Sequence, residues 1–199
     1  MTTIRVAFFG DSITNGTNDP ECLGWVGRAA AAAWRRGHDV TVYNLGVRRE
    51  TSADIRARWE AEAAPRLRPG VAGGLVFAFG VNDCTIEGGR RRIDTAATAA
   101  NAAAILARAT ALAPTLMIGP TPVARAGDSA PVADLVPPLR DACDRAGVPF
   151  LDVLPALADA GGAWMREIAA GDGAHPGAAG YAALAAVVDA WPAWRAWLP

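Results

Sequence analysis

Two residues at opposite ends of the chain have side chains that can act together in catalysis. Ser12 follows an apolar run at residues 7–9 and Gly10, a pattern that predicts a strand ending in a tight turn that presents the serine. His175 lies three residues after Asp172. A serine hydroxyl is a weak nucleophile until a base takes its proton, and an Asp-x-x-His segment offers a histidine with a carboxylate to orient it. The pattern predicts a serine hydrolase.

Two further segments offer the hydrogen-bond donors that such an enzyme needs to stabilise a negatively charged oxygen. Gly46 follows the second predicted strand and can present an unobstructed backbone N–H. Asn82 follows the third predicted strand, and its side-chain amide is another donor. Because the carboxyl ends of parallel strands meet at one edge of a sheet, we expect Ser12, Gly46 and Asn82 to converge there. The neighbouring Asp83 is expected to brace its own loop.

Short apolar runs alternate with longer helical segments, which is typical of β-α-β units and a parallel sheet. The sequence therefore predicts the α/β fold class. Strands are expected at residues 4–9, 40–44, 75–79, 116–118 and 150–153. Helices are expected at residues 25–36, 52–64, 94–113, 132–146 and 176–191, with a short helix near residues 164–169. Thr51 or Ser52 can cap the second of these helices, and Gly147 can end the fourth.

Length and composition limit what the protein can be. The 199 residues, 52% of them hydrophobic, predict a single domain over residues 1–199. A formal net charge of -1 gives no reason to expect nucleic acid or an anionic membrane as partner. Three cysteines without close pair spacing argue against a disulfide framework and against a zinc site. The first residues leave no room for a signal segment and no stretch is apolar enough to span a membrane, so we expect a cytoplasmic location.

Taken together, these segments resemble the SGNH hydrolases, also called the GDSL esterase and lipase family. The resemblance is carried by Ser12 in Gly-Asp-Ser, by Gly46, by Asn82 in Gly-x-Asn-Asp and by His175 in Asp-x-x-His, which occur in the family's order. Ile13 stands where the family motif often has leucine, which is a volume-conserving change. The resemblance implies a three-layer α/β/α sandwich around a five-stranded parallel sheet with flavodoxin-like strand order 2-1-3-4-5.

The resemblance also implies an activity, the hydrolysis of carboxylic esters or thioesters through an acyl-enzyme. In that mechanism Ser12 is the nucleophile, His175 the base and Asp172 the carboxylate that orients it. The oxyanion is met by the Ser12 and Gly46 backbone N–H groups and by the Asn82 amide. No cofactor and no metal is implied, and the expected partner is a small-molecule ester, with the protein a monomer or a homodimer.

Other interpretations remain open from the sequence. A carbohydrate O-deacetylase is the alternative within the same family. A flavodoxin-like binding module with a phosphate at residues 12–17 is the alternative from another class, although it leaves Asp172 to His175 unexplained. Taken singly, Ser12 can be a helix cap, Gly46 a turn residue and Asn82 an Asx-turn residue. The second histidine, His38, is expected on the surface near a helix end.

Three more features carry expectations. Arg90, Arg91 and Arg92 precede a predicted helix, where the positive end of the helix dipole disfavours cations, so their charges need compensation. We expect them to form a solvated charge run. Recognition of an anionic group of the substrate is the less favoured interpretation. The three tryptophans of residues 191–197 are expected to hold the terminus against the body. The loops at the catalytic edge are too short for a lid domain, which predicts a shallow groove that accepts short acyl chains.

Overall fold

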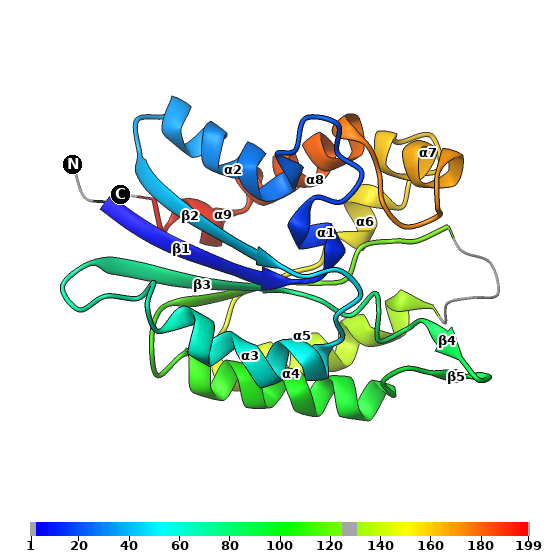
Figure 1. Cartoon of the computed structure of the whole chain (residues 1–199), viewed down its shortest axis with the longest axis horizontal. Coiled ribbons are helices and arrows are strands. Elements are labelled where there is room, and N and C mark those ends of the chain that lie inside the picture. The colour runs from blue at the N-terminus through cyan, green and yellow to red at the C-terminus, as the bar shows by residue number, and fades with distance from the viewer. Residues whose placement is uncertain (1–2, 125–130, 199) are drawn as a thin grey trace.

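A five-stranded parallel sheet forms the centre of the computed structural model, which describes residues 3–124 and 131–198 (Figure 1). Its strand order is β2-β1-β3-β6-β7. The strands are β1 (Thr3–Gly10), β2 (Asp39–Gly46), β3 (Ala72–Ala78), β6 (Thr115–Ile118) and β7 (Phe150–Leu151). Numbered among themselves, these strands follow the order 2-1-3-4-5, so the predicted α/β fold and sheet order are confirmed.

Helices cover both faces of the sheet (Figure 1). One layer consists of α2 (Gly24–Arg35), α7 (Ala163–Ala170), α8 (Ala178–Ala190) and α9 (Pro192–Arg195). The opposite layer consists of α3 (Ser52–Ala63), α4 (Thr95–Ala109) and α5 (Val136–Ala146), the last preceded by a 3-10 turn over Val132–Leu135. A short helix α6 (Leu154–Leu157) follows β7. All six helices expected from the sequence are present.

The core lies on both sides of β1, because alternate side chains of a strand point to opposite faces. Phe8 packs edge-on against Trp25 of α2, with ring centroids 5.4 Å apart. Its neighbour Phe9 points to the other layer and packs against Trp59 of α3 at 6.2 Å. With both faces covered, the end of β1 that leads into Ser12 is fixed on each side.

The tryptophan-rich end of the chain packs against the body, as the sequence predicts. Trp194 is almost completely buried, and its ring lies 5.9 Å from that of Phe8. Trp197 lies against the backbone of Gly74 in β3, where a Cβ atom would come within 2.5 Å of the indole ring. The terminus therefore closes the helical layer that covers β1 and β3.

Three details differ from the expectations. Ser12–Asn15 forms a one-turn helix, α1. The loop after β3 contains a small hairpin, β4 (Ile86–Glu87) and β5 (Arg90–Arg91), whose turn residues Gly88 and Gly89 have φ of 58° and 76°. A Gly-Gly pair with positive φ at both positions is the signature of a tight hairpin turn, and this signal was present in the sequence. Helix α8 begins at Ala178 and not at Pro176.

None of the described helices combines the length and apolar character needed to cross a membrane.

Candidate active site

Local backbone chemistry places Ser12 at the first position of α1. Asp11 is the N-cap, and its Oδ1 accepts a hydrogen bond from the Ile13 N–H at 2.9 Å. Gly10 has to be glycine, because a Cβ atom there would lie 2.1 Å from the Thr14 hydroxyl and 2.3 Å from the Ala78 carbonyl oxygen. Gly16 ends the helix with φ of 86°, a left-handed conformation that suits glycine. This sharp turn presents the serine at the carboxyl end of β1.

The sequence-predicted trio of serine, histidine and aspartate is in contact. Ser12 Oγ lies 2.7 Å from His175 Nε2. His175 Nδ1 lies 2.6 Å from Asp172 Oδ2. Both distances are those of hydrogen bonds. A hydroxyl, an imidazole and a carboxylate in this order can pass a proton from the serine to the histidine and stabilise the resulting imidazolium.

The segment that carries Asp172 and His175 is held between two helices. It leaves α7 through Gly173, whose φ is 82° and whose N–H donates to the Ile168 carbonyl at 2.9 Å. Beyond the histidine, Glu167 of α7 accepts hydrogen bonds from the first turn of α8, at 2.7 Å from the Gly180 N–H. A carboxylate at a helix N-terminus is favourable because it meets free N–H groups and the positive end of the dipole. The base is therefore fixed from both sides.

The Asp172 carboxylate is ionised over the whole ordinary pH range. Burial raises its pKa, but hydrogen bonds from the His175 backbone, the His175 ring and the Ala174 N–H outweigh this and hold the pKa well below its usual value. The two backbone donors lie 2.9 Å and 3.0 Å from Asp172 Oδ1. A permanently charged carboxylate beside the ring is what an imidazolium intermediate needs.

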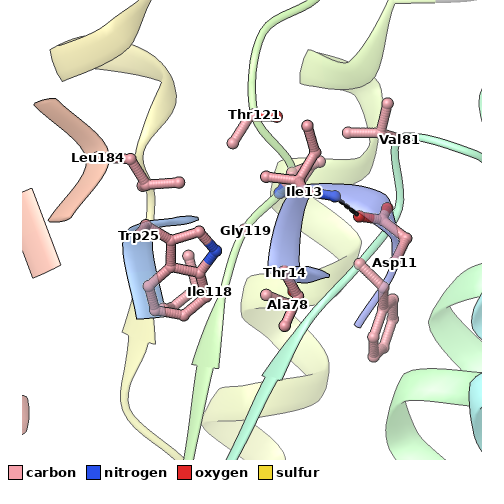
Figure 2. A pocket seen from close by; sticks show the side chains of 12 residues that line it. Asp11, Ile13, Thr14, Trp25, Ala78, Val81, Ile118, Gly119, Thr121 and Leu184 are labelled. Atoms are coloured by element: carbon pink, nitrogen blue, oxygen red, sulfur yellow. Dashed lines mark hydrogen bonds between the residues drawn. The ribbon is translucent and has the colours of Figure 1, made fainter. Parts of the chain in front are cut away.

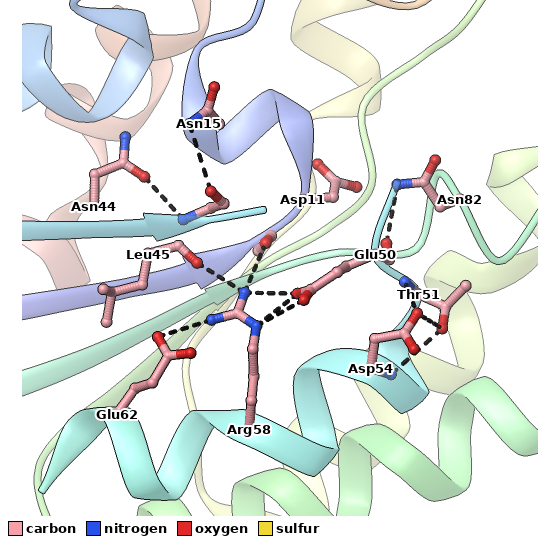
Figure 3. A network of polar contacts seen from close by, with 12 residues as sticks. Asp11, Asn15, Asn44, Leu45, Glu50, Thr51, Asp54, Arg58, Glu62 and Asn82 are labelled. Atoms are coloured by element: carbon pink, nitrogen blue, oxygen red, sulfur yellow. Dashed lines mark hydrogen bonds and ion pairs between the residues drawn. The ribbon is translucent and has the colours of Figure 1, made fainter. Parts of the chain in front are cut away.

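Asn82 lies on the loop after β3, as expected, and faces the same hollow as Ser12 and His175. Its Nδ2 donates to the Glu50 carbonyl at 2.9 Å, which leaves the second hydrogen of this amide for another acceptor (Figure 3). Asp83 braces the loop as predicted: its carboxylate accepts from the Ser52 N–H at 2.8 Å and from the Thr98 hydroxyl at 2.7 Å.

Gly46 lies at the carboxyl end of β2, as expected, but its N–H is engaged by a neighbouring side chain. Its N–H donates to Asn44 Oδ1 at 3.1 Å (Figure 3), and the same Asn44 side chain donates to the Thr14 carbonyl at 2.8 Å. Gly46 is not among the described residues that line the hollow next to Ser12. It packs instead against the backbone of α1, where a Cβ atom would come within 2.3 Å of the Asn15 nitrogen. Its glycine character is thus explained by close packing, and its predicted role as a donor is not supported.

The turn that follows Gly46 was not singled out from the sequence. It is closed by a hydrogen bond of 3.4 Å from the Glu50 N–H to the Val47 carbonyl, and Arg49 within it has φ of 68°. A non-glycine residue in this region is uncommon and is often found at functional sites. Within the described part of the chain, the N–H groups of Arg48 and Arg49 have no acceptor. These two donors lie on the turn whose Glu50 carbonyl contacts Asn82.

Two small cavities lie beside Ser12. The first has about 350 Å³ of free space, which includes open solvent, and is lined by Ser12, Ile13, Val81, Asn82, Thr85, Val123, Ala174 and His175. The second has about 280 Å³ of free space, which also includes open solvent, and is mostly apolar, with Trp25, Leu184 and Ile118 on its walls (Figure 2). Ile13 and Val81 line both cavities, so the space around the nucleophile is divided and narrow.

Two acidic side chains beneath the site are buried. Burial raises the pKa of Asp11 to about 7, and the nearby Asp83 carboxylate adds to the effect although backbone N–H groups oppose it. Burial likewise raises the pKa of Asp83. The adjacent Cys84 is also buried, which raises the pKa of its thiol to about 11 and keeps it protonated. The described cysteines form no disulfide.

The remaining candidates lie apart from the trio. His38 precedes β2 at the opposite edge of the sheet from Ser12. Arg91 and Arg92 are engaged by neighbouring loops: Arg91 pairs with Asp134 at 2.6 Å, and Arg92 donates to the Arg49 carbonyl at 2.8 Å. The expected solvated charge run is therefore found only at Arg90, which is exposed, whereas Arg91 and Arg92 are largely buried and compensated by these contacts. Across residues 3–124 and 131–198, no group of three histidine, cysteine or acidic side chains is arranged to hold a metal ion.

Comparisons with known proteins give the family and the fold of this chain. The model of the GDSL-like lipase/acylhydrolase family matches residues 8–183. A lipase/acylhydrolase from Enterococcus faecalis is 24% identical, with a TM-score of 0.78 over 95% of this chain and 94% of that one. The acetylxylan esterase Axe2 from Geobacillus stearothermophilus is 18% identical, with a TM-score of 0.73 over 98% and 96% of the two chains.

A member of the lipolytic G-D-S-L family from Veillonella parvula is 21% identical, with a TM-score of 0.74 over 94% of this chain and 96% of that one. No curated protein matches the sequence. The family match covers most of the chain and includes the Gly-Asp-Ser, Gly-x-Asn-Asp and Asp-x-x-His segments. The chain belongs to the GDSL-like lipase/acylhydrolase family and is an ester-hydrolysing enzyme.

Proposed function

We propose that this enzyme cleaves esters of short carboxylic acids through an acyl-enzyme on Ser12. His175 takes the proton from Ser12 Oγ as this oxygen attacks the ester carbonyl. The tetrahedral intermediate collapses, the leaving alcohol receives the proton from His175, and the acyl group stays on the serine. Water, activated by the same histidine, then releases the acid. The observation that carries this proposal is the distance of 2.7 Å between Ser12 Oγ and His175 Nε2.

The negative charge of the intermediate needs donors on the side of the carbonyl away from the histidine. The Ser12 N–H at the start of α1 and the second hydrogen of the Asn82 amide are two of them. For the third we favour an N–H of the Val47–Glu50 turn over that of Gly46. The turn contacts Asn82 and its Arg48 and Arg49 N–H groups have no acceptor among the described residues, whereas the Gly46 N–H already donates to Asn44.

The shape of the cavities supports short acyl groups. The free space beside Ser12 is divided by Ile13 and Val81, which line both cavities, and this narrow shape favours a short acyl group. An O-acetylated carbohydrate is the second candidate, because acetyl is the shortest common acyl group and one structural neighbour is an acetylxylan esterase.

A fluorophosphonate ester tests the nucleophile directly. Mass spectrometry is expected to find the phosphonyl group on Ser12. Ser12→Ala is expected to lower kcat on an aryl acetate by several orders of magnitude, on the order of a million-fold in a well-studied serine protease. Exposed Cys22 provides the control, since Cys22→Ser removes a surface nucleophile and is expected to leave both labelling and turnover unchanged. Labelling at another residue with full activity of Ser12→Ala would contradict the proposal.

A further inference from the structure

A largely buried arginine outside the catalytic trio joins the ends of β1 and β2 to the turn that ends at Glu50. Arg58 lies on α3, and its side chain is 17% exposed. Its Nε donates to the Glu50 carboxylate at 2.7 Å, and one terminal nitrogen lies 2.6 Å from the same carboxylate (Figure 3). The other terminal nitrogen donates to Glu62 at 3.0 Å. The guanidinium is thus held in one orientation by two glutamates.

The same guanidinium reaches the ends of the two strands that lead into the site. It donates to the Leu45 carbonyl at 2.8 Å and to the Gly10 carbonyl at 3.4 Å. Gly10 precedes the nucleophile turn, and Leu45 precedes Gly46 at the end of β2. Only arginine presents five donors in a rigid planar fork, so a lysine cannot make this set of contacts.

Glu50 connects this cluster to Asn82. Its carboxylate is bound by Arg58, and its backbone carbonyl accepts the hydrogen bond from Asn82 Nδ2 at 2.9 Å. Glu50 also closes the turn that begins at Val47. The chain of contacts therefore runs from the end of β1 through Arg58 and Glu50 to the amide that faces Ser12 and His175 (Figure 3).

We propose that Arg58 and Glu50 are positioning residues that hold the Asn82 amide and the Val47–Glu50 turn in place relative to Ser12. The inference rests on the proposed function, in which these groups stabilise the oxyanion. Donors aimed at a developing charge help only when they are oriented before the reaction, and a displacement of about 1 Å can cost on the order of 100-fold in rate. Neither residue contacts the hollow itself, so both act through their neighbours.

Three variants separate positioning from general stability. Arg58→Met keeps the length of the side chain without the fork, Arg58→Lys keeps the charge without the fork, and Glu50→Gln keeps the backbone carbonyl that Asn82 uses. The matched control is Arg108→Met, which removes an exposed ion pair with Glu60 of the same helix α3. All variants are assayed at a temperature at which circular dichroism shows them folded. If Arg58→Met does not fold, Glu50→Gln and Arg58→Lys test the positioning role.

For the three variants we expect kcat on an aryl acetate to fall about 10- to 100-fold, with KM changed by less than about threefold. Binding of a trifluoromethyl ketone, which forms a tetrahedral adduct with the serine, is expected to weaken by the same factor. The pH at the midpoint of the pH–rate profile is expected to remain unchanged, because the substitutions do not alter His175 or Asp172. The control is expected to match the wild type in all three measurements.

The decisive measurement is the coupling to Asn82. Glu50→Gln is introduced both into the wild type and into Asn82→Ala. The fold decrease in kcat is expected to be at least about fivefold smaller in the Asn82→Ala background, because the effects of residues that act through one another are not additive. Additive effects, or three variants with wild-type kcat, would overturn the positioning role. An active Ser12→Ala variant would instead refute the proposed function. If Ser12→Ala is inactive and Glu50→Gln is fully active, the proposed function stands and only the positioning role is refuted.

Discussion

Asp172 holds His175 at two points at once. One carboxylate oxygen lies 2.6 Å from the ring Nδ1, and the other accepts from the His175 backbone N–H at 2.9 Å. The spacing of three residues makes this possible, because the chain turns back on itself between the two side chains. The ring is thereby fixed both in its rotation and in its position along the backbone, with Nε2 directed at Ser12 Oγ.

Asp172→Asn is therefore expected to lower kcat by about 10⁴, as the corresponding change does in a serine protease, because an amide neither stabilises the imidazolium nor selects the productive tautomer. One amide oxygen still accepts the backbone N–H bonds, so the thermal midpoint is expected to change little. Asp159→Asn, an exposed residue of the loop before α7 whose carboxylate also accepts a backbone N–H, is the matched control. Steady-state assays in which Asp172→Asn and Asp159→Asn are equally active would rule out the assigned role.

Asn82→Ala is expected to lower kcat by about 10² to 10³, the usual effect of removing one oxyanion donor, with a much smaller change in KM. The loop itself is held by the Asp83 carboxylate and not by Asn82, so the fold is expected to survive. The measurement is kcat and KM on an aryl acetate together with a thermal melt. A rise in KM by the same factor, with kcat unchanged, would assign Asn82 to substrate binding instead.

The buried Asp11 predicts a pH dependence of stability. Its folded pKa is about 7 against an ordinary value of 3.8, so between these two pH values the folded state keeps a proton that the unfolded state has lost. Stability is therefore expected to fall as pH rises through this window, by up to ~4 kcal/mol, and to stay at the lower level above it.

Asp11→Asn isolates this effect, because the amide oxygen can still accept from the Ile13 N–H and carries no charge. The difference in thermal midpoint between Asp11→Asn and the wild type is expected to be larger at pH 8.5 than at pH 5. Asp19→Asn is the opposite control, since its hydrogen bond with Arg28 lowers the pKa of Asp19 to about 2. An Asp11→Asn difference that is independent of pH would show that Asp11 is ionised in the folded protein below pH 5.

Acyl chain length tests the size of the site. The space beside Ser12 is divided by Ile13 and Val81 and buries only the first carbons of a chain, while each further buried methylene would contribute about 0.8 kcal/mol. We expect kcat/KM on aryl esters to be highest from acetyl to hexanoyl and to decline beyond, with no increase when the substrate forms micelles. A value that still rises through dodecanoyl and palmitoyl esters would show that longer chains find apolar surface outside this cavity.

Much of the site follows from local sequence. The run before Gly10 alternates between two buried faces, which defines β1, and the requirement for glycine and an Asp11 cap then places Ser12 at the start of a helix. The Asp-x-x-His spacing brings carboxylate and ring together within a single turn of chain. The Asp11 cap and the Asp-x-x-His turn depend on neighbours within a few residues, so a sequence alone is enough to predict them, whereas the need for glycine at position 10 also depends on the Ala78 carbonyl of β3. The strand order followed from the resemblance to a known family.

Tertiary packing decided the rest. The Gly46 N–H is the clearest case: whether it faces the serine depends on the Asn44 side chain, whose amide is held by the Thr14 carbonyl of another element. The raised pKa of Asp11 likewise arises from burial beneath α1 and from the charge of Asp83, which is distant in sequence.

Arg58 shows the same limit. In the sequence it is one of two arginines of α3, and nothing local distinguishes it from Arg56. Its contacts with Gly10, Leu45 and Glu50 exist only after β1, β2 and α3 have come together. Hydrogen bonds between residues far apart in the chain depend on the relative placement of whole elements, to within a few tenths of an ångström. The sequence alone singled out Ser12, Asp172 and His175, whereas the hydrogen bonds of the Gly46 N–H and of the Arg58 guanidinium were decided by tertiary packing.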